Sequence, residues 1–267
     1  MIKKLTTLLI VLCFILSAQT AGAVNVYVDG KLVTDSAAIY NGSTYVPLRA
    51  LCGALCPSPT VSWNGTAASA RTGSLSLLAV PGSSYINANG RLLHVPDGVK
   101  LTNGSTLVPV RVLAKAAGAS VSWDGASRSV YMNSGSGYIA SGDSFYNADD
   151  LYWLSRIISS ESRGEPLEGK IAVGAVVLNR VASSQFPDTI YGVIFDDKYG
   201  VQFEPTSNGT IYDESTSESI IAAKLCLDGA NTVGGSLYFL NTATASSLWI
   251  TNSRTYVTTI GNHSFYS

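Results

Sequence analysis

The sequence predicts an α+β protein, with a duplicated β-rich N-terminal domain that carries short helices and an α-dominated C-terminal domain. Three observations lead to this prediction. Residues 37–70 and 98–130 repeat one pattern of strands and turns, residues 133–144 are rich in Gly and Ser, and apolar runs with helical spacing follow residue 148. The chain of 267 residues is long enough for two modest domains.

The composition narrows the classes of function. Charged residues make up only 13% of the chain, the formal net charge is −1, and the sequence has neither a basic stripe nor an acidic block. A protein that binds nucleic acid needs positive charge to contact phosphates, so we do not expect a nucleic-acid partner. Abundant Gly, Ser, Thr and Asn beside 46% apolar residues are typical of a secreted protein rich in turns and strands.

Residues 1–23 have the pattern of a secretory signal peptide. Lys3 and Lys4 precede an apolar run that ends at Leu16, and Ala21 and Ala23 form a small-residue cleavage site. Because the apolar run is short for a membrane span, we expect cleavage after Ala23, secretion, and no membrane attachment of the mature chain. Without cleavage, the same segment would anchor the N-terminus.

Three cysteines, Cys52, Cys56 and Cys226, remain after removal of the signal peptide. Cys52 and Cys56 lie four positions apart in "ALCGALCP", a spacing that fits either a local disulfide or two small buried residues at a helix end. The sequence leaves these two states open. So few cysteines do not make a disulfide-stapled scaffold.

The repeat defines the predicted domain at residues 24–133. Each copy has Asn-Gly-Ser-Thr, Val-Pro, an arginine, an Ala-rich helical stretch, and Ser-Trp before Asn-Gly or Asp-Gly. Asn-Gly and Asp-Gly between apolar runs indicate hairpins. The repeat resembles the copper amine oxidase N-terminal-like domain, which implies an extracellular spacer or binding module.

His94 is the one histidine in this range and no ligand cluster surrounds it, so we expect no metal ion. Residues 134–147 are predicted to be a flexible Gly/Ser linker.

A carboxylate on an apolar stripe is the main feature of the second predicted domain, residues 148–267. Asp149 or Asp150 is predicted to cap a helix that carries Leu154 on its core-facing side. Glu161 lies only about 20° from Leu154 around the helix axis, so it extends the apolar stripe. Burial raises the pKa of a carboxyl group, and a protonated glutamate near neutral pH is what general acid catalysis requires.

The alternative for Glu161 is a structural ion pair with Arg163, Arg180 or Lys170. Beyond this helix, apolar spacing predicts a second, mostly buried helix within 167–187. A third helix is predicted at 215–229, and residues 234–250 and 256–267 are predicted to be extended. Helices followed by short extended pieces indicate an α-dominated domain with a cleft.

Five segments of this second half resemble one family in order. They are "SRIISSESRGEPLEGKIAVGAVVLNRV", "FPDTIYGVIF", "QFEP", "GGSLYFLN" and "GNHSF". They are similar to the catalytic domain of SleB-type cell wall hydrolases, the spore cortex-lytic enzymes of endospore formers. The resemblance implies a lysozyme-like, lytic-transglycosylase-like fold that acts on peptidoglycan glycan strands, located at the cell wall or spore, without a cofactor.

The resemblance also implies that Glu161 is the catalytic acid and base. The reaction would cleave the bond between N-acetylmuramic acid and N-acetylglucosamine as a lytic transglycosylase does, in breakdown of the spore cortex at germination. We expect a monomer. The candidates for substrate binding are Gln202, Phe203, Tyr238, Asn241 and His263.

These candidates offer the groups that sugar binding needs, each with a structural alternative. Gln202 and Phe203 supply an amide and an aromatic face. Tyr238 and Asn241 fit acetamido groups, but a buried tyrosine and a turn asparagine explain them equally well. His263 fits a structural or substrate hydrogen bond better than the role of a base. Trp249, which lies nearby in the sequence, would either stack on a sugar or pack in the core.

Three other functions stay open. A hydrolytic muramidase would need a second carboxylate, for which Glu204 and Asp188 are the candidates; the family more usually has a small residue at the position of Glu204. An N-acetylmuramoyl-L-alanine amidase has little support, because His94 and His263 belong to different domains and no zinc motif is present. The third is a non-catalytic wall-binding protein. The sequence does not separate spore cortex from vegetative peptidoglycan as the target.

Overall fold

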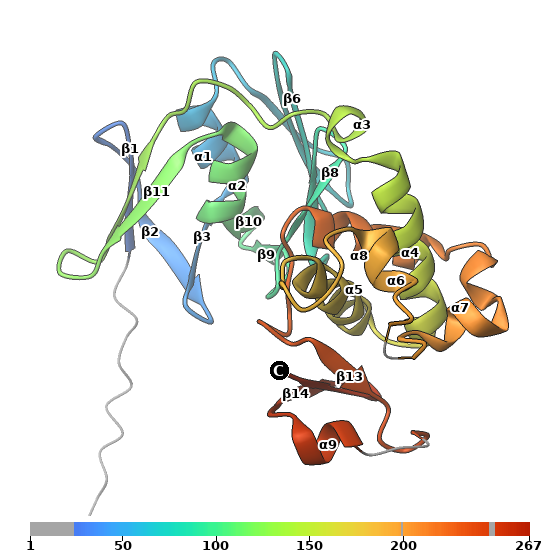
Figure 1. Cartoon of the computed structure of the whole chain (residues 1–267). Helices are drawn as coiled ribbons and strands as arrows, with labels where there is room; N and C mark the ends of the chain where they lie inside the picture. The colour runs from blue at the N-terminus through green and yellow to red at the C-terminus, as the bar shows by residue number, and fades with distance from the viewer. Residues whose placement is uncertain (1–23, 199, 246–248) are drawn as a thin grey trace, which may run out of the picture.

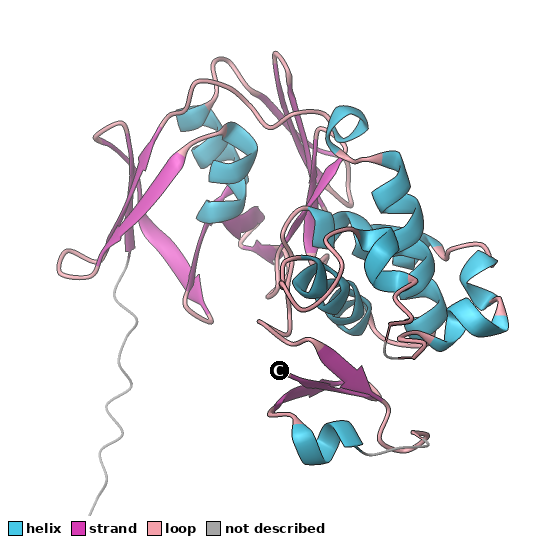
Figure 2. Ribbon diagram, in the orientation of Figure 1, coloured by secondary structure: helices cyan, strands magenta, loops and turns pink. Residues whose placement is uncertain are grey.

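A computed structural model describes residues 24–198, 200–245 and 249–267, so the predicted signal peptide lies outside the described residues. The chain forms a β-rich N-terminal region and a helical C-terminal region, which confirms the predicted fold class (Figures 1 and 2). Within the described ranges, none of the helices has the length and apolar character that crossing a membrane requires.

The first sheet of the N-terminal region has seven strands in the order β11-β12-β1-β2-β3-β10-β9. Its strands are β1 (Val24–Val28), β2 (Lys31–Tyr40), β3 (Ser43–Pro47), β9 (Lys100–Thr102), β10 (Ser105–Pro109), β11 (Ser120–Asp124) and β12 (Ser129–Asn133). Strand β1 pairs in parallel with β12, and the other neighbours are antiparallel. Alternate residues of β1 are buried, because successive side chains of a strand point to opposite faces.

The second sheet has five antiparallel strands in the order β4-β5-β6-β7-β8. Its strands are β4 (Thr60–Trp63), β5 (Ala68–Thr72), β6 (Leu75–Ala79), β7 (Tyr85–Ala88) and β8 (Arg91–His94). Two short helices, α1 (Leu48–Leu55) and α2 (Val110–Ala117), lie between the sheets (Figure 1). Both sheets and both helices contribute to one hydrophobic core.

The sequence repeat appears in the structure as a local two-fold relation. Strands β3 and β10 are equivalent in the two copies, and they pair antiparallel to each other. Val46 faces Val108, its own equivalent, and Leu107 faces Pro47 as Tyr45 faces Pro109. Each strand leads directly into one short helix, as predicted. The start of each helix therefore lies beside the strand of the other copy.

The C-terminal region is built on three packed helices, α4 (Ala148–Ser162), α5 (Leu167–Val181) and α8 (Ser217–Leu227). Their apolar stripes form a second hydrophobic core. The predicted cap of α4 was wrong: Asn147, rather than Asp149 or Asp150, accepts hydrogen bonds from the backbone N–H groups of these two aspartates, at 2.9 and 3.0 Å. Both aspartates lie in the first helical turn, where the helix dipole favours negative charge.

Shorter elements surround these helices. They are α3 (Gly142–Phe145), α6 (Ile190–Ile194), α7 (Glu204–Asn208), a 3₁₀ turn (Thr210–Tyr212), α9 (Trp249–Ser253), β13 (Tyr238–Leu240), β14 (Tyr256–Ile260) and β15 (His263–Tyr266). The three strands form a small antiparallel sheet in the order β13-β15-β14. The prediction of extended structure for 234–250 was therefore wrong at its end, where α9 is helical.

The segment predicted as a flexible linker, 134–147, has defined partners along its length. The backbone N–H of Ile139 donates to the carbonyl of Ala116 at 3.0 Å, and the Asn89 side chain donates to the carbonyl of Ile139 at 2.9 Å. Tyr138 and Ile139 also pack against the first core. These apolar residues and hydrogen bonds fix the segment, whereas its Gly and Ser content alone predicts mobility.

The two regions pack directly on each other. Leu92, from β8 of the second sheet, is buried in the core of the C-terminal helices. Beside it, the carboxylate of Asp228 at the end of α8 accepts hydrogen bonds from Arg91, with Nε at 3.0 Å, and from the hydroxyl of Tyr146 at 2.5 Å. Lys115 donates to the Asp228 backbone carbonyl at 2.5 Å. We call Asp228, Arg91, Tyr146 and Lys115 the junction cluster.

Cys52, Cys56 and Cys226 are all buried free thiols. Of the two states that the spacing of Cys52 and Cys56 allows, the structure has two small buried side chains rather than a disulfide. Cys226 lies in α8 against α5, where its thiol donates to the carbonyl of Ile171 at 3.3 Å.

Candidate active site

Glu161 lies in the last turn of α4, at the edge of the hydrophobic core, and it lines a cavity. Three residues of the same stripe, Leu154, Ile157 and Ile158, are completely buried, and Glu161 itself is partly buried. The cavity has a volume of about 360 Å³. Its lining residues are Ser160, Glu161, Arg163, Glu204, Pro205, Asn208, Thr210 and Asp213. The carboxyl group therefore has apolar packing behind it and open space in front.

The environment of Glu161 favours the protonated carboxyl group. Burial first, and then the negative charge of Glu204, raise the pKa of Glu161 from 4.5 to about 7, while the positive charge of Arg180 opposes this rise. The direction predicted from the helix pattern is thus confirmed. At neutral pH a large fraction of Glu161 carries the proton that a general acid has to donate.

The ion-pair alternative for Glu161 is wrong in this structure, where no salt bridge joins Glu161 to another described residue. Lys170 instead pairs with Glu218 at 2.7 Å. Arg163 donates to the backbone carbonyl of Glu214 at 3.3 Å, and Arg180 to that of Leu237 at 2.8 Å. Each of the three proposed cations is thus held by another partner.

Arg180, which the sequence predicted only as a possible ion-pair partner of Glu161, lies among the candidate binding residues. It is buried in the last turn of α5, and its guanidinium group lies over the rings of Phe186, Phe203 and Tyr238, at 5.0, 5.1 and 5.7 Å from their centroids. Its Nη1 has no hydrogen-bond partner. Burial lowers the pKa of Arg180 to about 10, so the group stays positive at neutral pH.

The signal that identifies Arg180 was present in the sequence. Val173, Val176 and Val177 lie seven, four and three positions before it, so Arg180 continues a buried stripe of α5 as Glu161 continues one of α4. The same test of a charge on an apolar face therefore finds both residues. The unpartnered Nη1 indicates a place where a ligand can accept a hydrogen bond, because buried polar atoms usually have a partner.

The structure brings two of the predicted binding residues together. Phe203 is buried and Tyr238 is partly buried, and both rings contact the Arg180 guanidinium. Gln202 donates from its side chain to the carbonyl of Gly200 at 2.9 Å. Asn241 accepts at 3.0 Å from the backbone N–H of Ala243, which is the turn role given as its alternative.

His263 is connected to Phe203 through the ring of Phe239, which lies 6.3 Å from Phe203 between ring centroids. Its ring packs edge-on against Phe239 at 5.3 Å, and its buried Nδ1 has no hydrogen-bond partner. Burial lowers the pKa of His263, although the nearby Glu165 carboxylate opposes this change. Glu165 in turn accepts hydrogen bonds from the backbone and side chain of Asn262, at 2.9 and 2.8 Å. A buried, neutral histidine of this kind fits a structural role or a hydrogen bond to substrate.

Of the two candidate second carboxylates, the structure places Glu204 beside Glu161. Glu204 is exposed at the start of α7 and lines the same cavity. Asp188 is exposed in the loop before α6 and is not part of the cavity wall. In the described ranges, no group of three or more His, Cys, Asp or Glu side chains is arranged to hold a metal ion.

Trp249, whose two roles the sequence left open, is half exposed at the start of α9, so it is not a core residue. The edge of its ring contacts Tyr238, with centroids 5.9 Å apart. It therefore extends the aromatic surface that begins at Arg180.

Comparison with known proteins gives a separate result for each region. Residues 164–266 match the Cell Wall Hydrolase family, and residues 27–132 match the Copper amine oxidase N-terminal domain. Glu161 lies three positions before the first of these matches.

Among curated proteins, the spore cortex-lytic enzyme of Bacillus cereus is 37% identical over 123 residues, 45% of each chain. That of Oceanobacillus iheyensis is 38% identical over 120 residues, 45% of this chain and 42% of the other. The chain thus spans less than half the length of these relatives.

Among solved structures, the catalytic domain of the germination-specific lytic transglycosylase SleB from Bacillus anthracis is 36% identical. The match covers 48% of this chain and 100% of that one, with a TM-score of 0.43.

Proposed function

We propose that this chain, which carries a cell wall hydrolase domain behind a copper amine oxidase N-terminal domain, cleaves the glycan strands of peptidoglycan with Glu161 as its catalytic acid. The observation that supports this most directly is the environment of Glu161. A carboxyl group with a pKa of about 7 borders an open cavity, and it has no cation paired to it among the described residues. The spore cortex-lytic enzymes among its relatives support peptidoglycan as the substrate.

The proposed reaction is a lytic transglycosylation. Protonated Glu161 donates its proton to the glycosidic oxygen between N-acetylmuramic acid and N-acetylglucosamine, and the bond from this oxygen to the muramic C1 breaks. The Glu161 carboxylate then takes the proton from the muramic C6 hydroxyl, whose oxygen forms a new bond to C1. The products are a free N-acetylglucosamine end and a 1,6-anhydromuramic end, and Glu161 is protonated again. General acid–base catalysis of this kind contributes roughly 10²–10⁴-fold to the rate.

The aromatic group around Arg180 is proposed to bind the substrate beside this acid. Phe203 and Tyr238 supply ring faces, and the unpartnered Nη1 of Arg180 supplies a donor for a sugar oxygen or a carboxylate. Gln202, Asn241 and His263 remain proposed binding residues. We further propose that the mature chain acts as a secreted monomer on the cortex of spores.

A second candidate function is hydrolysis by a muramidase. One observation favours it: Glu204 is a second carboxylate on the wall of the cavity that Glu161 borders. In that mechanism Glu204 would activate a water molecule or attack C1. Hydrolysis gives a reducing muramic end that is heavier than the anhydro product by one water molecule, so the product mass separates the two mechanisms.

The test is digestion of isolated peptidoglycan by the full mature chain, with products identified by mass spectrometry. Glu161→Gln should abolish release of muropeptides while the fold, followed by circular dichroism, is kept. Glu214→Gln is the matched control, because Glu214 is an exposed glutamate near the cavity but outside its wall. Cleavage at the wild-type rate by Glu161→Gln would refute the proposal, and free stem peptides would indicate an amidase. Parallel digestion of cortex and vegetative peptidoglycan tests the proposed role in spores.

A further inference from the structure

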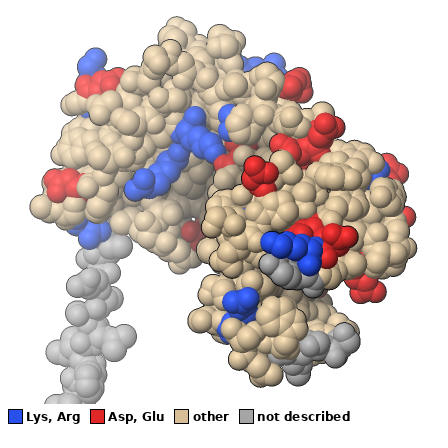
Figure 3. All heavy atoms as spheres, viewed as in Figure 1, with Lys and Arg blue, Asp and Glu red and all other residues tan. Residues whose placement is uncertain are grey.

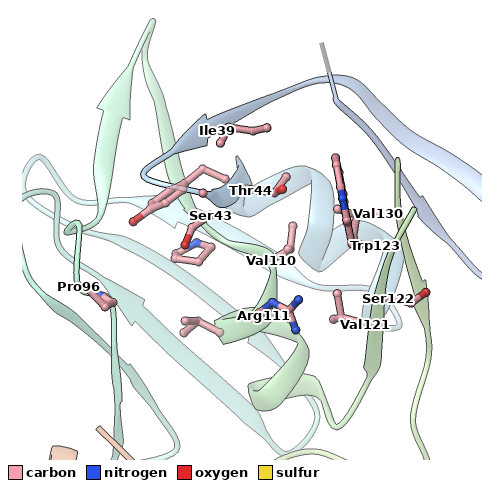
Figure 4. A pocket seen from close by; sticks show the side chains of 14 residues that line it. Ile39, Ser43, Thr44, Pro96, Val110, Arg111, Val121, Ser122, Trp123 and Val130 are labelled. Atoms are coloured by element: carbon pink, nitrogen blue, oxygen red, sulfur yellow. The ribbon is translucent and has the colours of Figure 1, made fainter. Parts of the chain in front are cut away.

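A large groove lies in the N-terminal domain and shares no wall residue with the cavity at Glu161. It has a volume of about 540 Å³ and is bordered by the turn between β2 and β3, the start of α2, and strand β11. Figure 4 shows Arg111 extending from α2 toward the strand that carries Val121 and Trp123, with Ser43 and Thr44 across the cavity. The groove thus combines an aromatic face, a positive charge and hydroxyl groups.

A second groove, of about 310 Å³, repeats this set of residues. It is bordered by Arg49 at the start of α1, by Ser62 and Trp63 on β4, and by Ser105 and Thr106 at the start of β10, in the other copy. The local two-fold relation between β3 and β10 explains this. Each groove takes its arginine and tryptophan from one copy of the repeat and an adjacent Ser-Thr pair from the other.

The repeated tryptophans are not needed to fill the core. Trp63 is 46% exposed and Trp123 is 45% exposed, whereas the core of this domain is made of smaller, fully buried residues. Large exposed apolar side chains at equivalent places in both copies indicate a contact surface, because such surface is costly to leave in water. Tryptophan and arginine are also the residues that most often carry binding energy.

The arginines differ between the copies in a way that indicates which groove binds an acidic ligand more strongly. Arg49 donates to the backbone carbonyl of Val61 at 3.0 Å, so it has a structural partner. Arg111 is exposed and makes no hydrogen bond or ion pair with the described residues. Neither groove has an acidic residue on its wall. Figure 3 shows a band of Lys and Arg side chains over α2, so a ligand here meets positive charge.

We propose that these two grooves are binding sites for an acidic glycan strand, namely the peptidoglycan that the C-terminal domain cleaves. The choice of polymer rests on the proposed function. The indole of Trp123 would stack on the apolar face of a sugar ring, and Arg111 would pair with a carboxylate of the muramic lactyl group or the stem peptide. The hydroxyl groups of Ser43 and Thr44 would hydrogen-bond the sugar. The groove around Trp63 is the second, weaker site.

Two sites on one domain suit a polymer with a repeating unit. A strand held in one groove is present at high effective concentration near the other, so two weak sites give a much tighter overall attachment. A small free ligand gains nothing from the second site. The duplication of tryptophan and arginine therefore favours a long strand over a single sugar as the ligand.

The test measures binding without cleavage, in the full mature chain with Glu161→Gln as the background. Depletion from solution by purified peptidoglycan sacculi gives the affinity. Trp123→Ala and Arg111→Ala should each weaken binding roughly fivefold to tenfold. Trp63→Ala should have a smaller effect, and the two tryptophan changes together should exceed either alone. Tyr131→Ala is the matched control, because Tyr131 is exposed on the same sheet but lies outside the groove wall.

Soluble N-acetylglucosamine oligomers, which have no carboxylate, test the role of Arg111. They should bind more weakly than muramic-acid-containing strands, and Arg111→Ala should not weaken them further. If Trp123→Ala and Arg111→Ala bind sacculi as tightly as the Glu161→Gln parent chain does, the proposed sites are wrong. Equal binding of neutral and acidic strands would overturn the assignment of an acidic ligand.

Binding by the grooves and cleavage at Glu161 are tested by different measurements, so one can be refuted without the other. Strands that bind through these grooves but are not cleaved by the chain with Glu161 intact would refute the proposed function alone. In the chain with Glu161 intact, Trp123→Ala should cleave short soluble strands at the normal rate and lose activity only on sacculi. Normal activity on both substrates would count against the grooves.

Discussion

At the scale of single residues, the charge of Glu161 depends on its neighbours. The nearby Glu204 raises the pKa of Glu161, and the proposed general acid is active only while protonated. We therefore expect kcat/KM to fall about tenfold per pH unit above a pKa near 7. Glu204→Gln removes a negative charge, which lowers the pKa of Glu161 and moves this alkaline limb to lower pH. The measurement is the pH–rate profile on soluble strands.

Asp188→Asn is the control for this shift, because Asp188 is exposed and does not line the cavity. Its alkaline limb should coincide with that of the unchanged chain. Complete loss of cleavage in Glu204→Gln at every pH would contradict the single-carboxylate mechanism and favour the hydrolytic one. The same variant thus separates an electrostatic role from a catalytic role of Glu204.

The raised pKa of Glu161 also affects stability. The folded state keeps the proton up to a pKa of about 7, but the unfolded state loses it near 4.5, so the folded protein loses stability as the pH rises between these values. The loss is up to about 3 kcal/mol at pH 8. Glu161→Gln cannot ionise and should therefore be more stable than the unchanged chain at pH 8, with little difference at pH 4. Urea unfolding at both pH values checks this, and equal stability at pH 8 would show that Glu161 is well solvated.

At the scale of elements, the close packing of α5 depends on a glycine. A methyl group at Gly174 would meet the Cys226 sulfur of α8 and the Ile158 Cδ1 of α4, each at 2.7 Å. Overpacking costs typically ~1–3 kcal/mol, and the better helix propensity of alanine offsets about 1 kcal/mol of it. We expect Gly174→Ala to lower the free energy of unfolding by about 1 kcal/mol, measured by urea denaturation.

Gly164 provides the matched control, because no atom lies within 4 Å of the position its methyl group would take. Gly164→Ala should leave stability unchanged or slightly higher. Adding Cys226→Ala to Gly174→Ala removes the sulfur and should recover part of the loss. Destabilisation by both glycine changes would mean that backbone freedom, rather than packing, is limiting.

The sequence predicted the main elements because their signals are local. The duplicated pattern, the helices α4, α5 and α8, and the position of Glu161 all follow from periodicity and turn residues. The cap of α4 was misplaced by two or three positions, because Asn147, Asp149 and Asp150 can all cap and only the backbone geometry selects one. Helix α9 was missed because five residues give too short a pattern.

At the scale of the whole molecule, the junction cluster joins the two regions. Asp228→Ala would leave Arg91 buried without its partner, and breaking a buried pair in this way costs about 3–5 kcal/mol. We expect calorimetry to show two separate unfolding transitions instead of one, and limited proteolysis to cut within 134–147. Lys115→Ala is the control, since this side chain is 44% exposed and its ion pair with Asp228 should contribute about 0–1 kcal/mol.

A single transition and full resistance to protease in Asp228→Ala would mean that the remaining contacts, such as buried Leu92 and the pair of His94 with Glu168, are enough to hold the regions together. The sequence could not predict this junction. Arg91 and Asp228 are 137 positions apart, and nothing local marks either residue as a partner of the other. The Gly/Ser segment between the regions even predicted the opposite arrangement. Contacts between residues so far apart in the sequence depend on how the folded domains pack together. The periodicity of the sequence contains no information about this packing.

The junction cluster has a consequence for the fragments that the chain would release. Because Leu92 and Asp228 lock one region onto the other, a strand held by the N-terminal grooves meets Glu161 at a constant offset along its length. The fixed distance between the grooves and Glu161 would then set the spacing of the cuts. The released glycan fragments would have a narrow distribution of lengths. Loosening the lock with Asp228→Ala would broaden that distribution without slowing each cut.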